Sequence, residues 1–229
     1  MRQLMIFFVL TPFFLWSQSN FEKGEQLFHA KKNKEAEVVF EENLKHHPND
    51  IKTLERLADI SAKEKQWEKT ASYYKKLKQL KPTEADYFYK YGGCLGMRAL
   101  EVNKLKAFGM VDDMKSSFEK AIDLNPKHLP ARWALIELYL QLPGILGGSE
   151  SKALKYSNEL AKLSPVDGYL SKGRIEEYFK RYDLAEKNYL KAHEIGNSKV
   201  TFQKLYNLYL NKLKESKKAH ELKRKFDSK

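Results

Sequence analysis

The histidines, the cysteine and the paired carboxylates are the residues of this sequence that could perform chemistry. None of the six histidines stands at the His-Glu-x-x-His spacing, or another close spacing, by which a helix binds a metal ion. Cys94 is the only cysteine, and no sequence signature of an activating base accompanies it. Adjacent carboxylates such as Glu176 and Glu177 point to different parts of a helix surface. The sequence therefore predicts no catalytic residue, no metal site and no bound cofactor.

Two glycine-rich segments could present backbone N–H groups to a phosphate. Segment 91–96, YGGCLG, falls within an expected helix, at a position of close helix packing. Segment 141–153, QLPGILGGSESKA, lacks the Gly-Lys-Ser/Thr ending of a phosphate loop, and Glu150 would repel a phosphate. We therefore interpret residues 143–148 as a structural loop, although a binding role stays open. We expect Ser149 to cap the helix that follows, and Ile145 and Leu146 to pack against the rest of the protein.

Lysine carries most of the positive charge of this chain. The sequence has 229 residues, of which 42% are hydrophobic, and a formal net charge of +12. Lysines at helical spacing usually mark a solvated face, whereas specific phosphate recognition favours arginine. The alternative is that the basic surface binds an anionic polymer or a membrane surface electrostatically.

The N-terminal residues 1–19 have the layout of a signal peptide. Arg2 precedes an uncharged apolar run of 13 residues, Leu4 to Trp16, and small or polar residues follow it. A run of this length is shorter than the roughly 20 residues that span a bilayer. We expect cleavage after Ser17 or Ser19, and a soluble product in the periplasm or outside the cell. An uncleaved membrane anchor is the alternative, and export would conflict with an intracellular nucleic-acid partner.

Residues 20–229 contain an internal repeat of about 34 residues. Four prolines, each after a helix-like segment, stand at successive spacings of 34, 44 and 39 residues, which indicates one repeat with two insertions. A small residue, and then an aromatic four residues later, precedes the proline in most units. The positions that carry the pattern are Ala36, Phe40 and Pro48; Thr70, Tyr74 and Pro82; Met114, Phe118 and Pro126; Ala153 and Pro165; and Ala185 and Tyr189.

This pattern predicts pairs of antiparallel helices, A and B, that stack on one another. A small residue in helix A, namely Gly24, Ala58, Gly92 or Gly173, would let helix B approach closely. The aromatic residue would then fill the space between one pair and the next, and the proline would end helix B. A single pair cannot bury both of its apolar faces, but a stack buries them continuously.

The phased prolines and Ala/aromatic pairs resemble the tetratricopeptide repeat (TPR) family over residues 20–229, with departures at Thr70, at Met114 and in the last unit. The resemblance implies an all-α fold, a right-handed α-solenoid of about five to six antiparallel helix pairs. The expected helices are 20–31, 34–46, 51–64, 67–80, 84–105, 110–124, 129–141, 149–163, 167–180, 182–195, 199–213 and 215–227. The insertion at 96–108 contains no breaker before Gly109, so it predicts a longer helix A whose exposed leucines pack together or form a contact site.

A solenoid of this kind has a concave surface lined by its A helices, and the resemblance implies that a protein or peptide binds there. Aromatic residues flanked by both signs of charge suit such a contact, although Trp133 and Tyr89 could equally be packing residues. The chain lacks the Lys/Asn set with which some members hold a C-terminal carboxylate. Helical register places ten candidate partner-binding residues on this face: Glu55, Asp59, Lys63, Tyr89, Met97, Trp133, Glu137, Arg174, Glu177 and Tyr178.

Overall fold

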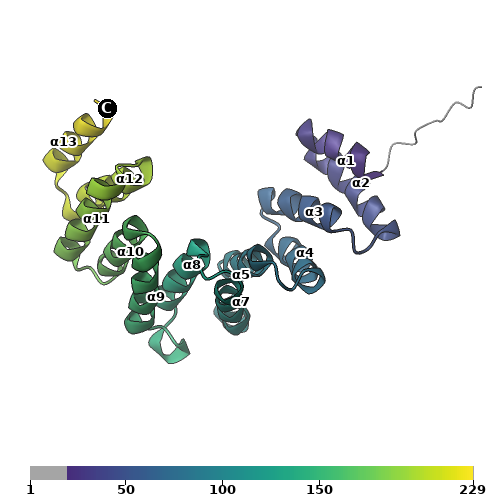
Figure 1. Ribbon diagram of the computed structural model, residues 1–229, viewed down its shortest axis with the longest axis horizontal. Coiled ribbons are helices and arrows are strands. Elements are labelled where there is room, and N and C mark those ends of the chain that lie inside the picture. The colour runs from purple at the N-terminus through teal and green to yellow at the C-terminus, as the bar shows by residue number, and fades with distance from the viewer. Residues whose placement is uncertain (1–19, 229) are drawn as a thin grey trace, which may run out of the picture.

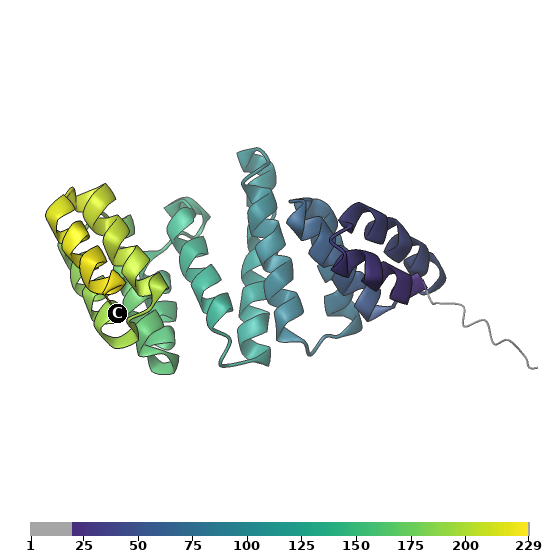
Figure 2. The same ribbon diagram turned by 90° about the horizontal axis from the view of Figure 1, so that it is seen from above.

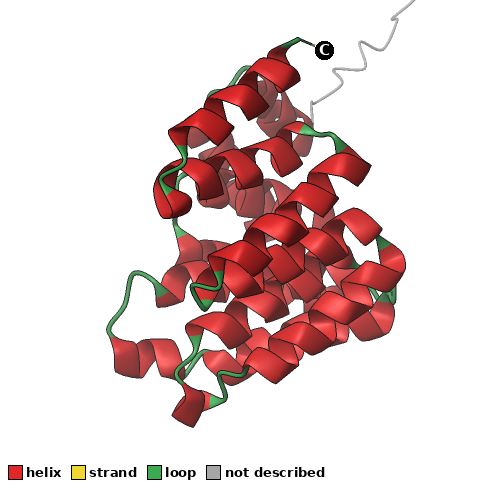
Figure 3. Ribbon diagram, turned by 90° about the vertical axis from the view of Figure 1, so that its left-hand side faces the viewer, coloured by secondary structure: helices red, strands yellow, loops and turns green. Residues whose placement is uncertain are grey.

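The structure is a computed structural model that describes residues 20–228, so the expected signal peptide, 1–19, lies outside the described residues. Within 20–228 the chain consists of helices joined by short loops, and no strand is present (Figure 3). The helices are arranged as an arch whose two ends are the two ends of the chain (Figure 1). The expected all-α solenoid is confirmed.

Six antiparallel helix pairs follow one another along the described residues, and each consists of a helix A and then a helix B. The upper end of the expected range of repeats is therefore correct. The pairs are α1 (Asn20–His29) with α2 (Asn33–His46), α3 (Ile51–Lys63) with α4 (Trp67–Leu80), α5 (Ala85–Ala99) with α7 (Val111–Leu124), α8 (Leu129–Gln141) with α9 (Glu150–Leu163), α10 (Pro165–Tyr178) with α11 (Tyr182–Gly196), and α12 (Lys199–Asn207), which continues as the π-helix η2 (Leu208–Leu213), with α13 (Ser216–Asp227).

The two helices of a pair lie on different sides of the arch. Helices α3, α8 and α10 are on its inner, concave side, and α4, α7 and α9 are on its outer side (Figure 1). Seen from above, the connections from helix A to helix B in the central pairs lie along one edge, and those from B to the next A lie along the opposite edge (Figure 2). We call the edge that carries the connections from helix A to helix B the A–B edge.

Polar side chains cap several of the A helices. Asp50 accepts a hydrogen bond from the Thr53 backbone N–H at 3.2 Å, and Ser164 does the same for Asp167 at 3.3 Å. Pro48, Pro82 and Pro126 follow the ends of B helices, as expected. Pro165 also follows the end of a B helix, since α9 ends at Leu163, and it is in addition the first residue of α10, where its missing N–H leaves no helical hydrogen bond unmade.

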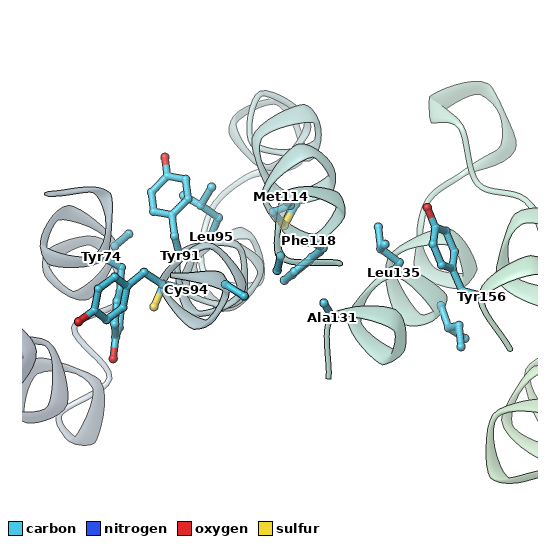
Figure 4. Packing of buried hydrophobic residues seen from close by; sticks show 14 of the residues in the cluster. Tyr74, Tyr91, Cys94, Leu95, Met114, Phe118, Ala131, Leu135 and Tyr156 are labelled. Atoms are coloured by element: carbon cyan, nitrogen blue, oxygen red, sulfur yellow. The ribbon is translucent and has the colours of Figure 1, made fainter. Parts of the chain in front are cut away.

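Glycine in helix A and the aromatic in helix B fit together as a matched contact. A Cβ atom added to Gly92 would lie 2.8 Å from Phe118 Cε1, and added to Gly24 or Gly173 it would overlap the ring of Phe40 or Tyr189. The aromatic therefore lies against its own pair first, rather than only between pairs as the sequence suggested. Phe40 also belongs to a buried cluster with Leu57 and Ile60 of the next pair. Figure 4 shows the same arrangement around Phe118, which stands on α7 between the side chains of α5 and those of α8.

The segment 96–108 is not the single long helix that the sequence predicted. Helix α5 ends at Ala99, and a short helix α6 (Lys104–Phe108) follows. Asn103 begins the new helix, because its side chain accepts a hydrogen bond from the Lys106 N–H at 3.0 Å. Leu100 and Leu105 are each 81% exposed, so packing against each other does not bury them.

The loop 143–148 is one turn of 3-10 helix, Gly144–Leu146, followed by two glycines. Gly147 has a φ of 92°, which suits glycine, and Ser149 caps α9 as predicted, through a 3.2 Å bond from the Lys152 N–H. The expectation for Ile145 was wrong: its side chain is 95% exposed, whereas Leu146 is half-buried. The turn holds Ile145 away from the helices because the loop backbone folds back on itself, with the Gly148 N–H donating to Pro143 O.

Gly148→Ala is expected to lower the free energy of unfolding by roughly 1–3 kcal/mol. A Cβ atom at residue 148 would overlap the carbonyl oxygen of Leu142, which is backbone and cannot rotate away. Gly144→Ala is the matched control, since a Cβ there meets nothing within 4 Å. Urea denaturation of both variants measures the difference. Equal stability of the two would mean that the loop is not held in this conformation.

Several buried tyrosines have carboxylates as neighbours. Tyr189 donates to Glu177 at 2.8 Å, and Tyr87 donates to Glu55 at 2.6 Å. Burial, and then the neighbouring carboxylates, raise the pKa of each of these phenols far above its ordinary value, because the ionised form would be poorly solvated. The buried tyrosines whose pKa is raised furthest are Tyr74, Tyr87, Tyr156, Tyr189 and Tyr209.

The protein is therefore expected to lose stability as the pH rises above about 10, the ordinary pKa of tyrosine. In the unfolded chain these phenols ionise from that pH upward, while in the folded chain they stay protonated. The unfolded state then binds fewer protons, so the free energy of unfolding falls with pH. Melting temperatures measured by circular dichroism between about pH 9 and pH 11 test this. Tyr156→Phe should make the decrease shallower, and an unchanged slope in that variant would contradict the assignment.

Candidate functional site: a cleft on the concave face

A cleft lies where three A helices, α5, α8 and α10, meet on the concave side of the arch. Its volume is about 520 Å³ and its surface is mostly apolar. Helix α8 supplies most of the lining, because it lies between the other two helices and touches both. The lining residues are Tyr89 from α5; Leu129, Pro130, Trp133, Ala134 and Glu137 from α8; and Asp167 from α10.

Trp133 forms one wall of the cleft and is fixed in place by a hydrogen bond. Its indole Nε1–H donates to Asp167 Oδ1 at 2.8 Å, across the boundary between the fourth and fifth pairs. The other carboxylate oxygen of Asp167 accepts from the Ser164 hydroxyl at 2.6 Å. Trp133 also packs against both large buried clusters of the solenoid. The ring is therefore only half-buried but is oriented before any partner arrives, which lowers the entropy cost of binding.

Tyr89 forms another wall of the cleft, and its ring is supported from below. The ring centroid lies 6.1 Å from that of Phe118 and 5.1 Å from that of His128. His128 is buried; its Nδ1 accepts from the Ala131 N–H at 3.0 Å, and its Nε2 lies 3.0 Å from Asp86 Oδ1. Because Nδ1 is an acceptor, Nε2 carries the proton and donates to Asp86. Tyr89 thus serves as a packing residue on one side and lines the cleft on the other.

The charged rim of the cleft is already paired within the protein. Glu137 accepts two hydrogen bonds from Arg174, at Nε and Nη2, both 2.8 Å. The Arg174 guanidinium also lies 5.6 Å from the ring centre of Tyr178, which is 38% exposed. Glu177 points to the interior side, where it accepts from Tyr189. A partner would therefore meet an apolar centre bordered by a bidentate ion pair and a partly exposed aromatic ring.

Four of the predicted residues lie elsewhere. Glu55 accepts from Tyr87, Asp59 lies 3.7 Å from Arg56, and the Lys63 ammonium is 4.2 Å from the ring centre of Phe28. Met97 stands near the far end of α5 and does not line the cleft. The structure thus brings together Tyr89, Trp133 and Glu137, with Arg174 bound to Glu137. No other predicted residue lines the cleft.

Asp167 is the cleft residue that sequence reasoning missed. A usable signal existed, because Asp167 follows Trp133 by 34 residues, which is one repeat, and lies in the first turn of α10 after the cap Ser164. Leu129, Pro130 and Ala134 of α8 were missed as well.

In the range 20–228 no three His, Cys, Asp or Glu side chains stand close enough to hold a metal ion. Cys94 is buried, and burial raises the pKa of its thiol to about 11, so it is a poor nucleophile at neutral pH. None of the helices in this range is both long and apolar enough to span a bilayer.

Comparison with known proteins places this fold among TPR solenoids. The chain is similar to a thermophilic TPR protein of Thermus thermophilus, with a TM-score of 0.61, 19% identity, and coverage of 84% of this chain and 98% of that one. It is similar to PilW, a type IV pilus biogenesis factor, with a TM-score of 0.60, 14% identity, and 91% of each chain covered. It is also similar to YrrB, a TPR protein with an unusual peptide-binding site, with a TM-score of 0.57, 15% identity, and coverage of 80% and 87%.

No protein-family model matches the chain, and no curated protein does. At these identities the similarity to solved structures shows the fold: an α-solenoid of TPR-like helix pairs.

Proposed function

We propose that this protein is a non-catalytic scaffold that holds a peptide, or an extended segment of another protein, against its concave face. The observation that carries the proposal is the cleft itself, in which Trp133 and Tyr89 form pre-positioned apolar walls between paired charges. Binding energy at protein interfaces is concentrated in such oriented aromatic residues near the centre of a patch with a polar rim.

The open shape of the cleft favours a polymer chain over a small metabolite. The cleft lies on the inner surface of an arch, where three repeats each contribute residues, so an extended chain can continue along neighbouring A helices. YrrB has a similar fold and is described as having a peptide-binding site. This agrees with a peptide ligand for the present chain.

We further propose that the protein acts in a bacterial cell envelope, after export directed by residues 1–19. The apolar run Leu4 to Trp16, followed by small and polar residues, supports this. The N-terminal sequence of the protein recovered from the periplasm tests the export step. Export predicts a mature start at Gln18 or Asn20, and a start at Met1 in the cytosolic fraction would refute it.

A photo-crosslinking amino acid at residue 89 tests the binding site in cells. The matched control is the same amino acid at residue 120, an exposed position of α7 on the outer side. We expect adducts with one or a few defined proteins from position 89, none of them from position 120, and their loss when Trp133→Ala is added. Adducts that survive Trp133→Ala, or that form equally from position 120, would show that the cleft is not the binding site.

A further inference from the structure

Three large apolar side chains stand in water at the A–B edge, away from the concave cleft. Leu100 and Leu105 are 81% exposed and Ile145 is 95% exposed. They come from two consecutive A–B connections, 100–110 and 142–149, and the first of these sits at the tip of a hairpin that rises above its neighbours (Figure 2). The three side chains are separate tips and do not line a common groove. They therefore do not form a binding site for a segment of another protein.

Lysine occupies a strained backbone position at four A–B turns. Lys31, Lys65, Lys180 and Lys214 have φ angles of 61°, 59°, 60° and 58°, in the left-handed region that glycine, asparagine and aspartate adopt more easily. All four residues are exposed. Glycine would adopt this backbone conformation more easily at each turn, so the conformation does not explain why lysine recurs there. A function of the lysine side chain at the A–B edge explains the recurrence.

The two edges of the solenoid differ in charge. The A–B connections, 30–32, 64–66, 100–110, 142–149, 179–181 and 214–215, contain eight Lys or Arg and three Glu, which is a formal charge of +5. The B–A connections, 47–50, 81–84, 125–128, 164 and 197–198, contain two Lys and two acidic residues, which is a formal charge of zero. The excess charge of the connections therefore lies on the same edge as the exposed apolar tips.

A cationic cleft opens on this edge between the α3–α4 turn and helix α6. Its volume is about 680 Å³, and Trp67 and Val102 supply apolar surface in it. Two of its cations are already paired, since Arg98 contacts Glu68 at 2.7 Å and Lys69 contacts Glu37 at 2.5 Å. The other two, Lys65 and Lys106, form none of the ion pairs found within residues 20–228. They remain available for an external anion.

From these observations we infer that the A–B edge is a membrane-contact surface, which binds the face of a lipid bilayer that carries anionic headgroups. Leu100, Leu105 and Ile145 enter the boundary between headgroups and acyl chains, while the lysines of the turns contact lipid phosphates. A lipid bilayer has an anionic surface and an apolar interior. The A–B edge presents cations together with separate apolar side chains, and so it complements both parts of the bilayer. In this orientation the concave face points along the membrane and stays open to a partner.

Environment-sensitive fluorophores on single cysteines test this contact directly. Cys94 is buried with a raised pKa, so maleimide reacts at an introduced cysteine instead. Leu105→Cys and Ile145→Cys place the label on the proposed surface, and Val200→Cys, 60% exposed beside the last B–A turn, is the matched control. The full chain is mixed with vesicles of phosphatidylcholine, with or without phosphatidylglycerol. Residues 1–19 are common to all three variants, so any overall vesicle binding that they cause is the same in each.

We expect a blue shift of the labels at 105 and 145 on vesicles that contain phosphatidylglycerol, and no shift of the label at 200. Lys65→Gln combined with Lys106→Gln should weaken vesicle binding by roughly tenfold or more. Lys127→Gln combined with Lys199→Gln, which removes the same charge from the opposite edge, should leave it unchanged.

Labels at 105 and 145 that remain in a water-like environment on every vesicle would overturn the inference. A blue shift that needs only a higher protein concentration, without vesicles, would also overturn it, because a second copy of the chain would then cover this edge. Circular dichroism of each variant confirms that the fold is retained.

Discussion

Tyr189→Ala is expected to lower the free energy of unfolding by about 3–5 kcal/mol, the range for removing a buried aromatic side chain. The Tyr189 side chain is fully buried, its ring covers Gly173 of the partner helix, and its hydroxyl donates to Glu177. Alanine would leave a cavity between α10 and α11, and glycine at residue 173 cannot fill it. Chemical denaturation with circular dichroism gives the free energy of unfolding.

Two further variants separate packing from hydrogen bonding at this position. Tyr189→Phe keeps the ring and removes only the hydroxyl, so it should cost about 1 kcal/mol. Gly173→Ala should destabilise the wild-type protein, because its Cβ atom would overlap the Tyr189 ring, but should cost much less in the Tyr189→Ala background. Additive effects of the two substitutions would mean that these residues are not a matched contact.

Trp133→Ala is expected to weaken peptide binding by roughly 30-fold or more, since truncating a central aromatic residue commonly costs 2 kcal/mol or more. The indole is a wall of the cleft and is held by its bond to Asp167. Isothermal titration with a peptide selected against the wild-type protein measures the loss. The melting temperature of the variant shows whether the fold is retained, because Trp133 also packs against both buried clusters.

Matched variants identify the cause of such a loss. Trp133→Phe keeps an aromatic wall but loses the hydrogen bond to Asp167, so binding should fall less than in the alanine variant. Met97→Ala removes an exposed apolar side chain from α5 outside the cleft, and should leave affinity unchanged. A peptide that is sensitive to Met97→Ala and indifferent to Trp133→Ala would place the binding site elsewhere on the solenoid.

The Trp133 prediction depends on contacts that join consecutive repeats. The bond from Trp133 to Asp167 and the ion pair between Glu137 and Arg174 connect α8 with α10, and Arg56 binds Glu25 in the same way between α3 and α1. Each connects helix A of one pair with helix A of the next. The concave face is thereby fixed across repeat boundaries, which keeps the cleft in shape before a partner binds.

The sequence by itself determined the helices, the pairing and the repeat. Proline and capping residues act within a few positions of themselves, so Pro48 and Ser149 could be interpreted from the sequence alone. The contact in which the Phe118 ring packs against Gly92 also follows from sequence spacing, because the repeat determines which helices are neighbours. Asn103 carried the same kind of local capping information, and the helix start that it marks was nevertheless missed.

Only the tertiary structure decided which surface residues come together and which stay exposed. Tyr89, Trp133 and Asp167 lie on three helices from different repeats, and their meeting depends on the small rotation between pairs, which accumulates along the stack and which no local pattern encodes. The sequence assigned the apolar side chain of Ile145 to the interior, and it left open whether Leu105 packs or stays exposed. They are exposed because the backbone of their turns, fixed by its own hydrogen bonds, holds them beyond the reach of the core.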